Sequence, residues 1–121
     1  MRWTRRGAVA LPPVFFFAAP AMAHSLLLGS EPGEGAVLRV GPGQITLRFN
    51  EPVQLTALRL FAADNAEWPL RRMRDMTARP EHRADIARDL TPGAWRAVWR
   101  AISADGHEIG GTLRFRLETP P

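Results

Sequence analysis

The feature that most constrains the fold of this chain is the alternation of apolar and polar residues in short segments that end at Pro- and Gly-rich turns. In residues 44–50 every second side chain is apolar, and residues 94–103 and 113–117 follow the same period of two. This period is typical of β-strands with one buried face. No segment has a helical period, so the pattern predicts an all-β domain.

The remaining apolar segments predict further short strands at residues 25–30, 37–40 and 53–61. Pro52 is expected to end or offset strand pairing, because proline has no backbone N–H to donate. Residues 71–88 are polar and contain Pro80, so we expect a loop there with a short helical turn or an edge strand. Residues 103–111 are expected to form a loop. About seven short strands in one domain favour an Ig-like or Greek-key sandwich or barrel.

Residues 1–23 have the features of a secretory signal peptide. Arg2, Arg5 and Arg6 precede a short apolar run at residues 8–19, and Ala-Met-Ala at 21–23 supplies a cleavage site. The run is shorter than the ~20 residues of a membrane span. We therefore predict Sec or twin-arginine export to the periplasm, a mature domain of residues 24–121 and no membrane span after cleavage. An uncleaved N-terminal anchor is the alternative.

Charge and composition exclude several classes of function. The chain has no Cys, which rules out disulfides, thiolate metal sites and a Cys nucleophile. Three of its 16 basic residues, all arginine, lie in the signal segment, which leaves 13 against 12 acidic residues. Arginine and acidic residues are interleaved over residues 71–89, whereas a nucleic-acid binder gathers positive charge on one face. We therefore expect no nucleic-acid partner.

Signal cleavage after Ala23 would make His24 the first residue of the mature protein. Its α-amine and Nδ1 could then chelate a metal ion, since an α-amine loses its proton easily near neutral pH. Asp105 and His107 are two residues apart, and Gly106 between them lets the chain bend towards a metal. The amine and imidazole of His24, the imidazole of His107 and the carboxylate of Asp105 would together supply three nitrogens and one oxygen. Such a set suits Cu(II), although nickel or zinc would accept similar ligands. The competing interpretation is that Asp105-Gly106 is simply a hairpin turn.

These residues carry a resemblance to the CopC family of periplasmic copper-binding proteins. It covers nearly all of residues 24–117. The matching segments are His24 with the Ser-x-Pro turn at 30–32, Leu-Arg-Phe-Asn-Glu-Pro-Val at 47–53, Gly-Ala-Trp at 93–95, Val-Trp-Arg-Ala-Ile-Ser-Ala-Asp-Gly-His at 98–107, and Gly111, Leu113 and Phe115.

The resemblance implies a Greek-key β-barrel of Ig-like or cupredoxin-like shape that holds one Cu(II) ion. The ligands it implies are His24, Asp105 and His107, and Glu51 matches a carboxylate that some members add. Other members carry a Cu(I) site of Met and His after the strand matched by residues 53–61. Residues 62–68 contain neither, so we predict no dedicated Cu(I) site and interpret Met73, Met76 and His82 as structural.

The function predicted from these features is that of a periplasmic copper carrier or buffer in copper homeostasis or resistance, without enzymatic activity. The resemblance implies a CopD-like inner-membrane protein as its partner, and we expect a monomer. Two alternatives stay open. A copper-dependent oxidative enzyme could use the same histidine chelate, and a metal-free Ig-like envelope module would tolerate replacement of His24.

Overall fold

The structure, a computed structural model, describes residues 26–119, and this part of the chain consists of strands, turns and loops without a helix. The predicted signal peptide and His24 lie outside the described residues. No segment between residues 26 and 119 forms a helix that could cross a membrane. The all-β prediction is confirmed. The strands are β1 (Leu27–Glu31), β2 (Ala36–Leu38), β3 (Gln44–Ala62), β4 (Glu67–Trp68), β5 (Leu70–Arg71), β6 (Arg79–Ile86), β7 (Gly93–Ile102) and β8 (Glu108–Leu117).

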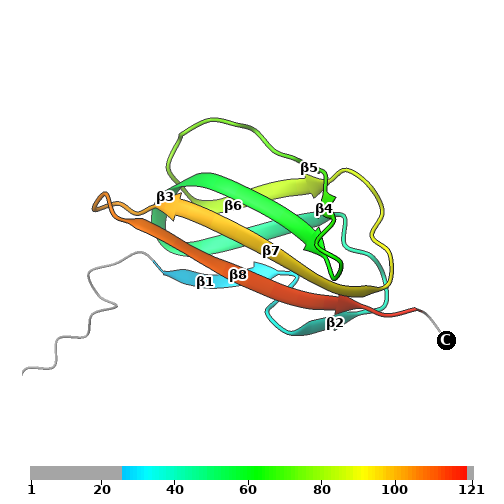
Figure 1. Ribbon diagram of the computed structural model, residues 1–121. Helices are drawn as coiled ribbons and strands as arrows, with labels where there is room; N and C mark the ends of the chain where they lie inside the picture. Colours follow the sequence, from blue (N-terminus) through cyan, green and yellow to red (C-terminus); the bar gives the residue numbers. More distant parts are fainter. Residues whose placement is uncertain (1–25, 120–121) are drawn as a thin grey trace, which may run out of the picture.

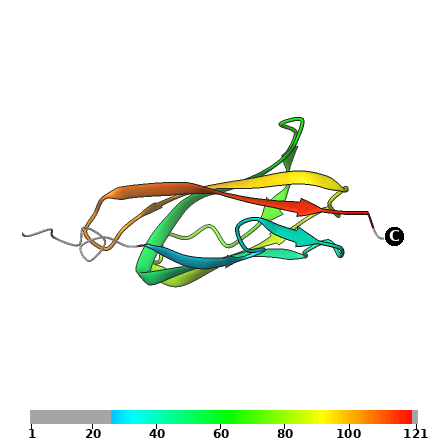
Figure 2. The ribbon, with the colours of Figure 1, turned by 90° about the horizontal axis from the view of Figure 1, so that it is seen from below.

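The strands form a curled sheet whose two layers face each other (Figures 1 and 2). The first layer contains β1, the first half of β3, β6 and β5. The second contains β4, the second half of β3, β7, β8 and β2. All neighbouring strands are antiparallel except β2, which runs parallel to β8.

β3 belongs to both layers, and this corrects the prediction of two separate strands. Residues 44–49 pair with β1 and β6, whereas residues 54–62 pair with β7. The register of the β3–β6 pairing shifts between Arg48 and Val53. Pro52 lies inside this interval, where its missing N–H breaks no ladder bond. Proline therefore offsets the pairing and lets the extended chain pass from one layer to the other.

The core lies between the layers and is built from the alternating apolar residues of the sequence. The predicted inward faces of residues 44–50, 94–103 and 113–117 are buried, and Trp95 and Trp99 are core residues as their alternation indicates. The buried hydrophobic residues are Ile45, Leu47, Phe49, Val53, Leu55, Leu58, Leu60, Ala84, Trp95, Ala97, Trp99, Ala101, Leu113, Phe115 and Leu117.

The polar region at residues 71–88 contains a loop at 72–78 and the strand β6, so the edge-strand prediction is confirmed and the helical turn is wrong. β5 pairs only with the last residues of β6, which leaves β6 close to the sheet edge. Pro80 falls opposite the shifted segment of β3, where a strand tolerates proline. Pairing with β3, which is distant in the sequence, thus makes a strand of residues whose polar composition favours a loop.

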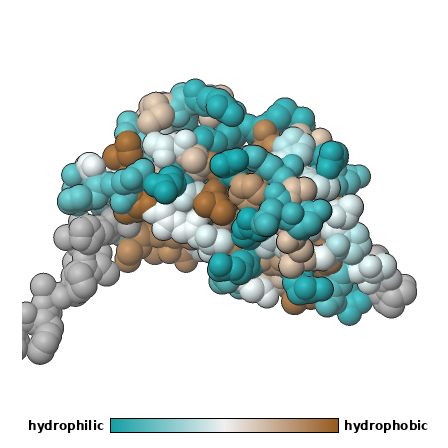
Figure 3. All heavy atoms as spheres, viewed as in Figure 1, coloured by the Kyte–Doolittle hydropathy of each residue, from teal (hydrophilic) through white to brown (hydrophobic). Residues whose placement is uncertain are grey.

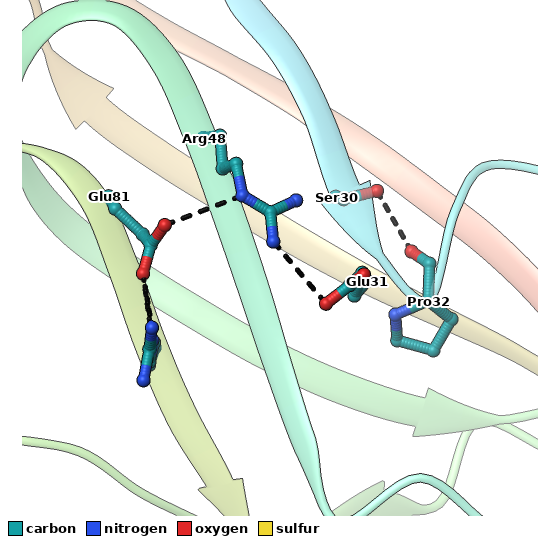
Figure 4. A network of polar contacts seen from close by, with 6 residues as sticks. Ser30, Glu31, Pro32, Arg48 and Glu81 are labelled. Carbon is teal, nitrogen blue, oxygen red and sulfur yellow. Dashed lines mark hydrogen bonds and ion pairs between the residues drawn. The ribbon is translucent and has the colours of Figure 1, made fainter.

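Arg48 connects three strands of the first layer on its outer face (Figure 4). Its Nη2 lies 3.3 Å from Glu31 Oε1 on β1, and its Nε lies 3.4 Å from Glu81 Oε1 on β6. All three side chains are more than a third exposed, so each ion pair contributes less than about 1 kcal/mol. The network therefore links the outer faces of β1, β3 and β6 and adds little to the stability of the fold.

The loop at residues 72–78 should make folding stability sensitive to acid. Asp75 accepts bonds from Arg79 at 2.9 Å and from the Thr77 N–H at 3.1 Å, and these bonds lower the pKa of Asp75 to about 2. A lowered pKa adds stability above the ordinary value of 3.8, which is lost as the pH falls towards 2. Denaturant titrations at pH 5 and pH 2.5 should show a smaller loss for Asp75→Asn than for the parent. Equal losses would contradict this role.

Candidate metal centre

The connection between β7 and β8 is a tight hairpin at residues 103–107. The Ser103 N–H donates to the His107 carbonyl over 2.8 Å, and the Gly106 N–H donates to the Ser103 carbonyl over 2.9 Å. Gly106 has a φ of 88°, a conformation that glycine adopts without steric cost. The hairpin-turn interpretation of Asp105-Gly106 is therefore confirmed. The loop is shorter than the predicted 103–111, because β8 begins at Glu108.

The same turn brings Asp105 and His107 together at the surface. Nδ1 of His107 lies 2.9 Å from Oδ2 of Asp105, and 68% of the His107 side chain is exposed. The carboxylate accepts, so in this geometry Nδ1 carries the hydrogen. A histidine whose one ring nitrogen is held by a carboxylate presents the other nitrogen, here Nε2, in a fixed direction, as metal-ligating histidines do.

Ser103 positions the carboxylate of this pair, and the sequence interpretation missed it. The Ser103 hydroxyl donates to Asp105 Oδ1 and accepts from the His107 N–H at 3.2 Å. The bond from Ser103, followed by that from His107, holds the pKa of Asp105 well below its ordinary value. Asp105 is therefore ionised throughout the physiological pH range. A serine two residues before an aspartate at a strand end is a local signal that could have pointed to this contact.

The start of β1 lies at the same end of the barrel as this hairpin (Figures 1 and 2). The Leu26 N–H donates to Oδ1 of Asn50 over 2.6 Å, and the Asn50 N–H donates to the Leu26 carbonyl over 3.0 Å. Asn50 thus holds both backbone groups of Leu26, the N–H and the carbonyl. The sequence did not predict this anchoring role of Asn50, although the residue lies in the segment 47–53 that carries the family resemblance.

The described residues bring together only part of the predicted ligand set. Asp105 and His107 meet, and His24 lies outside the described residues. Among residues 26–119, no three His, Asp or Glu side chains gather closely enough to hold a metal ion. Glu51, half-buried on β3, accordingly does not complete a group of three with Asp105 and His107.

The structural interpretation of His82 is confirmed, whereas the packing interpretation of the two methionines is wrong. His82 is buried, its Nε2 donates to the Val53 carbonyl over 2.8 Å, and its ring meets the edge of Phe49. The side chains of Met73 and Met76 are 74% and 52% exposed. They belong to the loop at 72–78, which runs outside the core, so their spacing of three residues does not reflect a helical face.

Comparison with known proteins places these features in a family. A family model described as the CopC domain matches residues 27–118. Copper resistance protein C of Pseudomonas syringae pv. tomato is 29% identical over 109 residues, which cover 84% of this chain and 86% of that protein. Copper transport protein CutJ of Bacillus subtilis is 27% identical over 97% of this chain, which spans only 22% of CutJ.

Solved structures agree in fold. CopC from Methylosinus trichosporium OB3b superimposes with a TM-score of 0.68 at 20% identity, over 81% of this chain and 97% of that one. PcoC, a methionine-rich copper resistance protein from Escherichia coli, gives a TM-score of 0.64 at 23% identity, over 78% of this chain and 99% of that one. The family model spans both layers of the sheet and the hairpin between β7 and β8, and the chain therefore belongs to the CopC domain family.

Proposed function

We propose that this protein is an exported copper-binding protein that holds one Cu(II) ion through His24, Asp105 and His107. It acts as a copper carrier or buffer in copper homeostasis or resistance, by binding and not by catalysis. The observation that carries the proposal is the exposed Asp105–His107 pair, held in a fixed geometry by the hairpin. The relatives named for copper resistance and copper transport support copper as the metal.

The N-terminal histidine is proposed as the second part of the site, after removal of residues 1–23 in the periplasm. Leu26 is anchored to Asn50 at the hairpin end of the barrel. Two residues of fully extended chain span at most about 7 Å, so His24 must stay within that distance of Leu26. Because Leu26 lies at the hairpin end of the molecule, a connection this short would let His24 reach towards the proposed ligands, and its amine and imidazole would add two nitrogens.

Asp105 is proposed as the carboxylate ligand of the site. Its pKa is lowered, so the carboxylate needs to lose no proton when the metal binds. While Asp105 keeps its bond to Nδ1 of His107, its carboxylate lies on the opposite side of the ring from a metal at Nε2. This bond must therefore open for the two residues to bind the same ion. A monomer that exchanges copper with a CopD-like membrane protein is the proposed cellular context, in line with the family resemblance.

The test is a Cu(II) titration, followed by EPR, of the protein that begins at His24 and of a control with one alanine added before it. We expect tight one-to-one binding with a nitrogen-rich tetragonal spectrum. The extended control should bind more than about tenfold more weakly, since losing even an outer-shell partner costs about 10- to 100-fold. Equal binding would show that the amine is not a ligand, and no binding by either protein would overturn the copper proposal.

A further inference from the structure

The outer face of the second layer gathers positive charge that the metal centre does not use. Residues that alternate with the buried side chains of β3, β7 and β8 point to this face. It carries Arg59, Arg96, Arg100, Arg114 and Arg116. Arg59 lies 2.8 Å from Glu67, and Arg100 lies 3.2 Å from Glu108, so these two charges are neutralised within the fold.

The other three arginines have no acidic side chain within ion-pair distance among residues 26–119. Arg96 and Arg114 lie directly opposite each other on β7 and β8, an arrangement of like charges that destabilises a sheet. The nearby Glu34 carboxylate accepts from the backbone N–H of Arg114, at 2.9 Å. Arg96 stacks over Phe61, with its guanidinium carbon 4.7 Å from the ring centre. A bound anionic group would relieve the repulsion between Arg96 and Arg114.

A groove of about 420 Å³ adjoins the three arginines. Its lining is mainly apolar and includes Val37, Ala63 and Ala94 beside Arg96, Arg114 and Arg116. Figure 3 shows this face of the molecule, where hydrophilic side chains surround paler and brown apolar ones. An apolar groove with a cationic rim can bury an aliphatic side chain while its arginines bind carboxylates in bidentate fashion.

We propose that this groove, together with Arg96, Arg114 and Arg116, is a docking site for an acidic segment of a partner protein in which carboxylates alternate with apolar side chains. The positive charge favours an anionic partner, and the apolar lining favours a peptide over a nucleic-acid backbone or a lipid headgroup surface. A second copy placed face to face would bring arginines against arginines. The protein's own N-terminal segment carries Arg2, Arg5 and Arg6, which the site would repel.

The docking site lies at the other end of the strands from the proposed metal centre. Arg116 follows Glu108, the first residue of β8, by eight positions, which corresponds to about 26 Å along a strand. Loss of the docking site should therefore leave Cu(II) binding unchanged. The two proposals can fail independently.

The test is an NMR titration of the ¹⁵N-labelled protein with two capped peptides, DLELDLEL and DSESDSES, which have equal charge. The leucine peptide should shift the amide signals of residues 35–37, 94–96 and 114–116. Arg114→Gln/Arg116→Gln should bind it at least about tenfold more weakly, because two charge-assisted contacts are lost. The matched control Arg71→Gln/Arg74→Gln removes two other exposed positive charges and should bind within about twofold of the parent.

Several outcomes would overturn the docking proposal. These are absence of binding, an equal loss in the control variant, or equal affinity for the serine peptide, which would leave no role for the groove. Vesicles of phosphatidylglycerol and phosphatidylcholine in equal parts, and a DNA duplex, are the competing anionic probes. Tighter binding of either through the same arginines would reassign the site to membranes or to nucleic acid.

Discussion

Replacing His107 by alanine should lower the affinity of the protein for Cu(II) by about 100-fold or more. Loss of an outer-shell partner already costs about 10- to 100-fold, and a direct ligand contributes at least as much. The imidazole is 68% exposed and lies outside the core, so the variant should fold normally. Isothermal titration with a competing chelator measures the affinity, and EPR should show the loss of one nitrogen.

Glu108→Gln is the matched control for His107→Ala. Glu108 is the next residue of the same hairpin, is similarly exposed and pairs with Arg100 at 3.2 Å. This control should bind Cu(II) within about twofold of the parent, since exposed ion pairs contribute little. If both variants lost affinity to the same extent, the result would show that the charge of the hairpin attracts the metal and that the His107 imidazole has no specific role. Unchanged affinity in His107→Ala would remove His107 from the ligand set.

Replacing Gly111 by alanine should destabilise the fold by about 2–3 kcal/mol, the upper part of the range for an overpacked core. Gly111 lies opposite Trp99 in the β7–β8 pairing, and a Cβ there would lie 2.9 Å from Cζ2 of the indole ring. Trp99 is buried and makes a T-shaped contact with the Phe49 ring, so the surrounding core must shift to make room for the added Cβ. The midpoint of thermal unfolding should fall by about 8–24 °C, by the usual scaling for a domain of this size.

Gly29→Ala separates this clash from the general effect of losing a strand glycine. Gly29 lies on β1, and an added Cβ there would have no heavy atom within 4 Å. Its backbone is not in the left-handed region, so alanine should be neutral or stabilise by up to about 1 kcal/mol. Equal destabilisation of the two variants would mean that contact with Trp99 is not the cause.

The sequence predicted those elements whose own residues determine them. Alternation identified the buried faces of β7, β8 and the first half of β3, because a period of two directly reports one buried face. The two-residue strands β4 and β5 could not be predicted, since they exist only through pairing with β3 and β6. Pro52 led to the prediction of two strands in place of the continuous β3. Proline interrupts a strand only where a partner strand needs a backbone N–H at that position, and the sequence does not show whether one does.

In the candidate site, too, features that depend on local spacing were predicted and features that depend on side-chain geometry were not. Asp105 and His107 were predicted because their spacing is local, and the turn that seemed to compete with a metal site is the device that brings them together. The contact of Ser103 and the anchoring of Leu26 by Asn50 depend on side-chain geometry that spacing does not specify. The positions of Met73 and Met76 were misjudged because the loop at 72–78 has no period from which exposure could be inferred.

The shared strand β3 makes the domain a single cooperative unit. Its first half pairs with β1 and β6 and its second half pairs with β7, so the two layers share one continuous strand. Local melting that spares half of the molecule is thereby disfavoured, and protection of backbone amides from exchange should be similar in both layers. A ligand that binds at one end of such a domain therefore raises the free energy of unfolding of the whole domain.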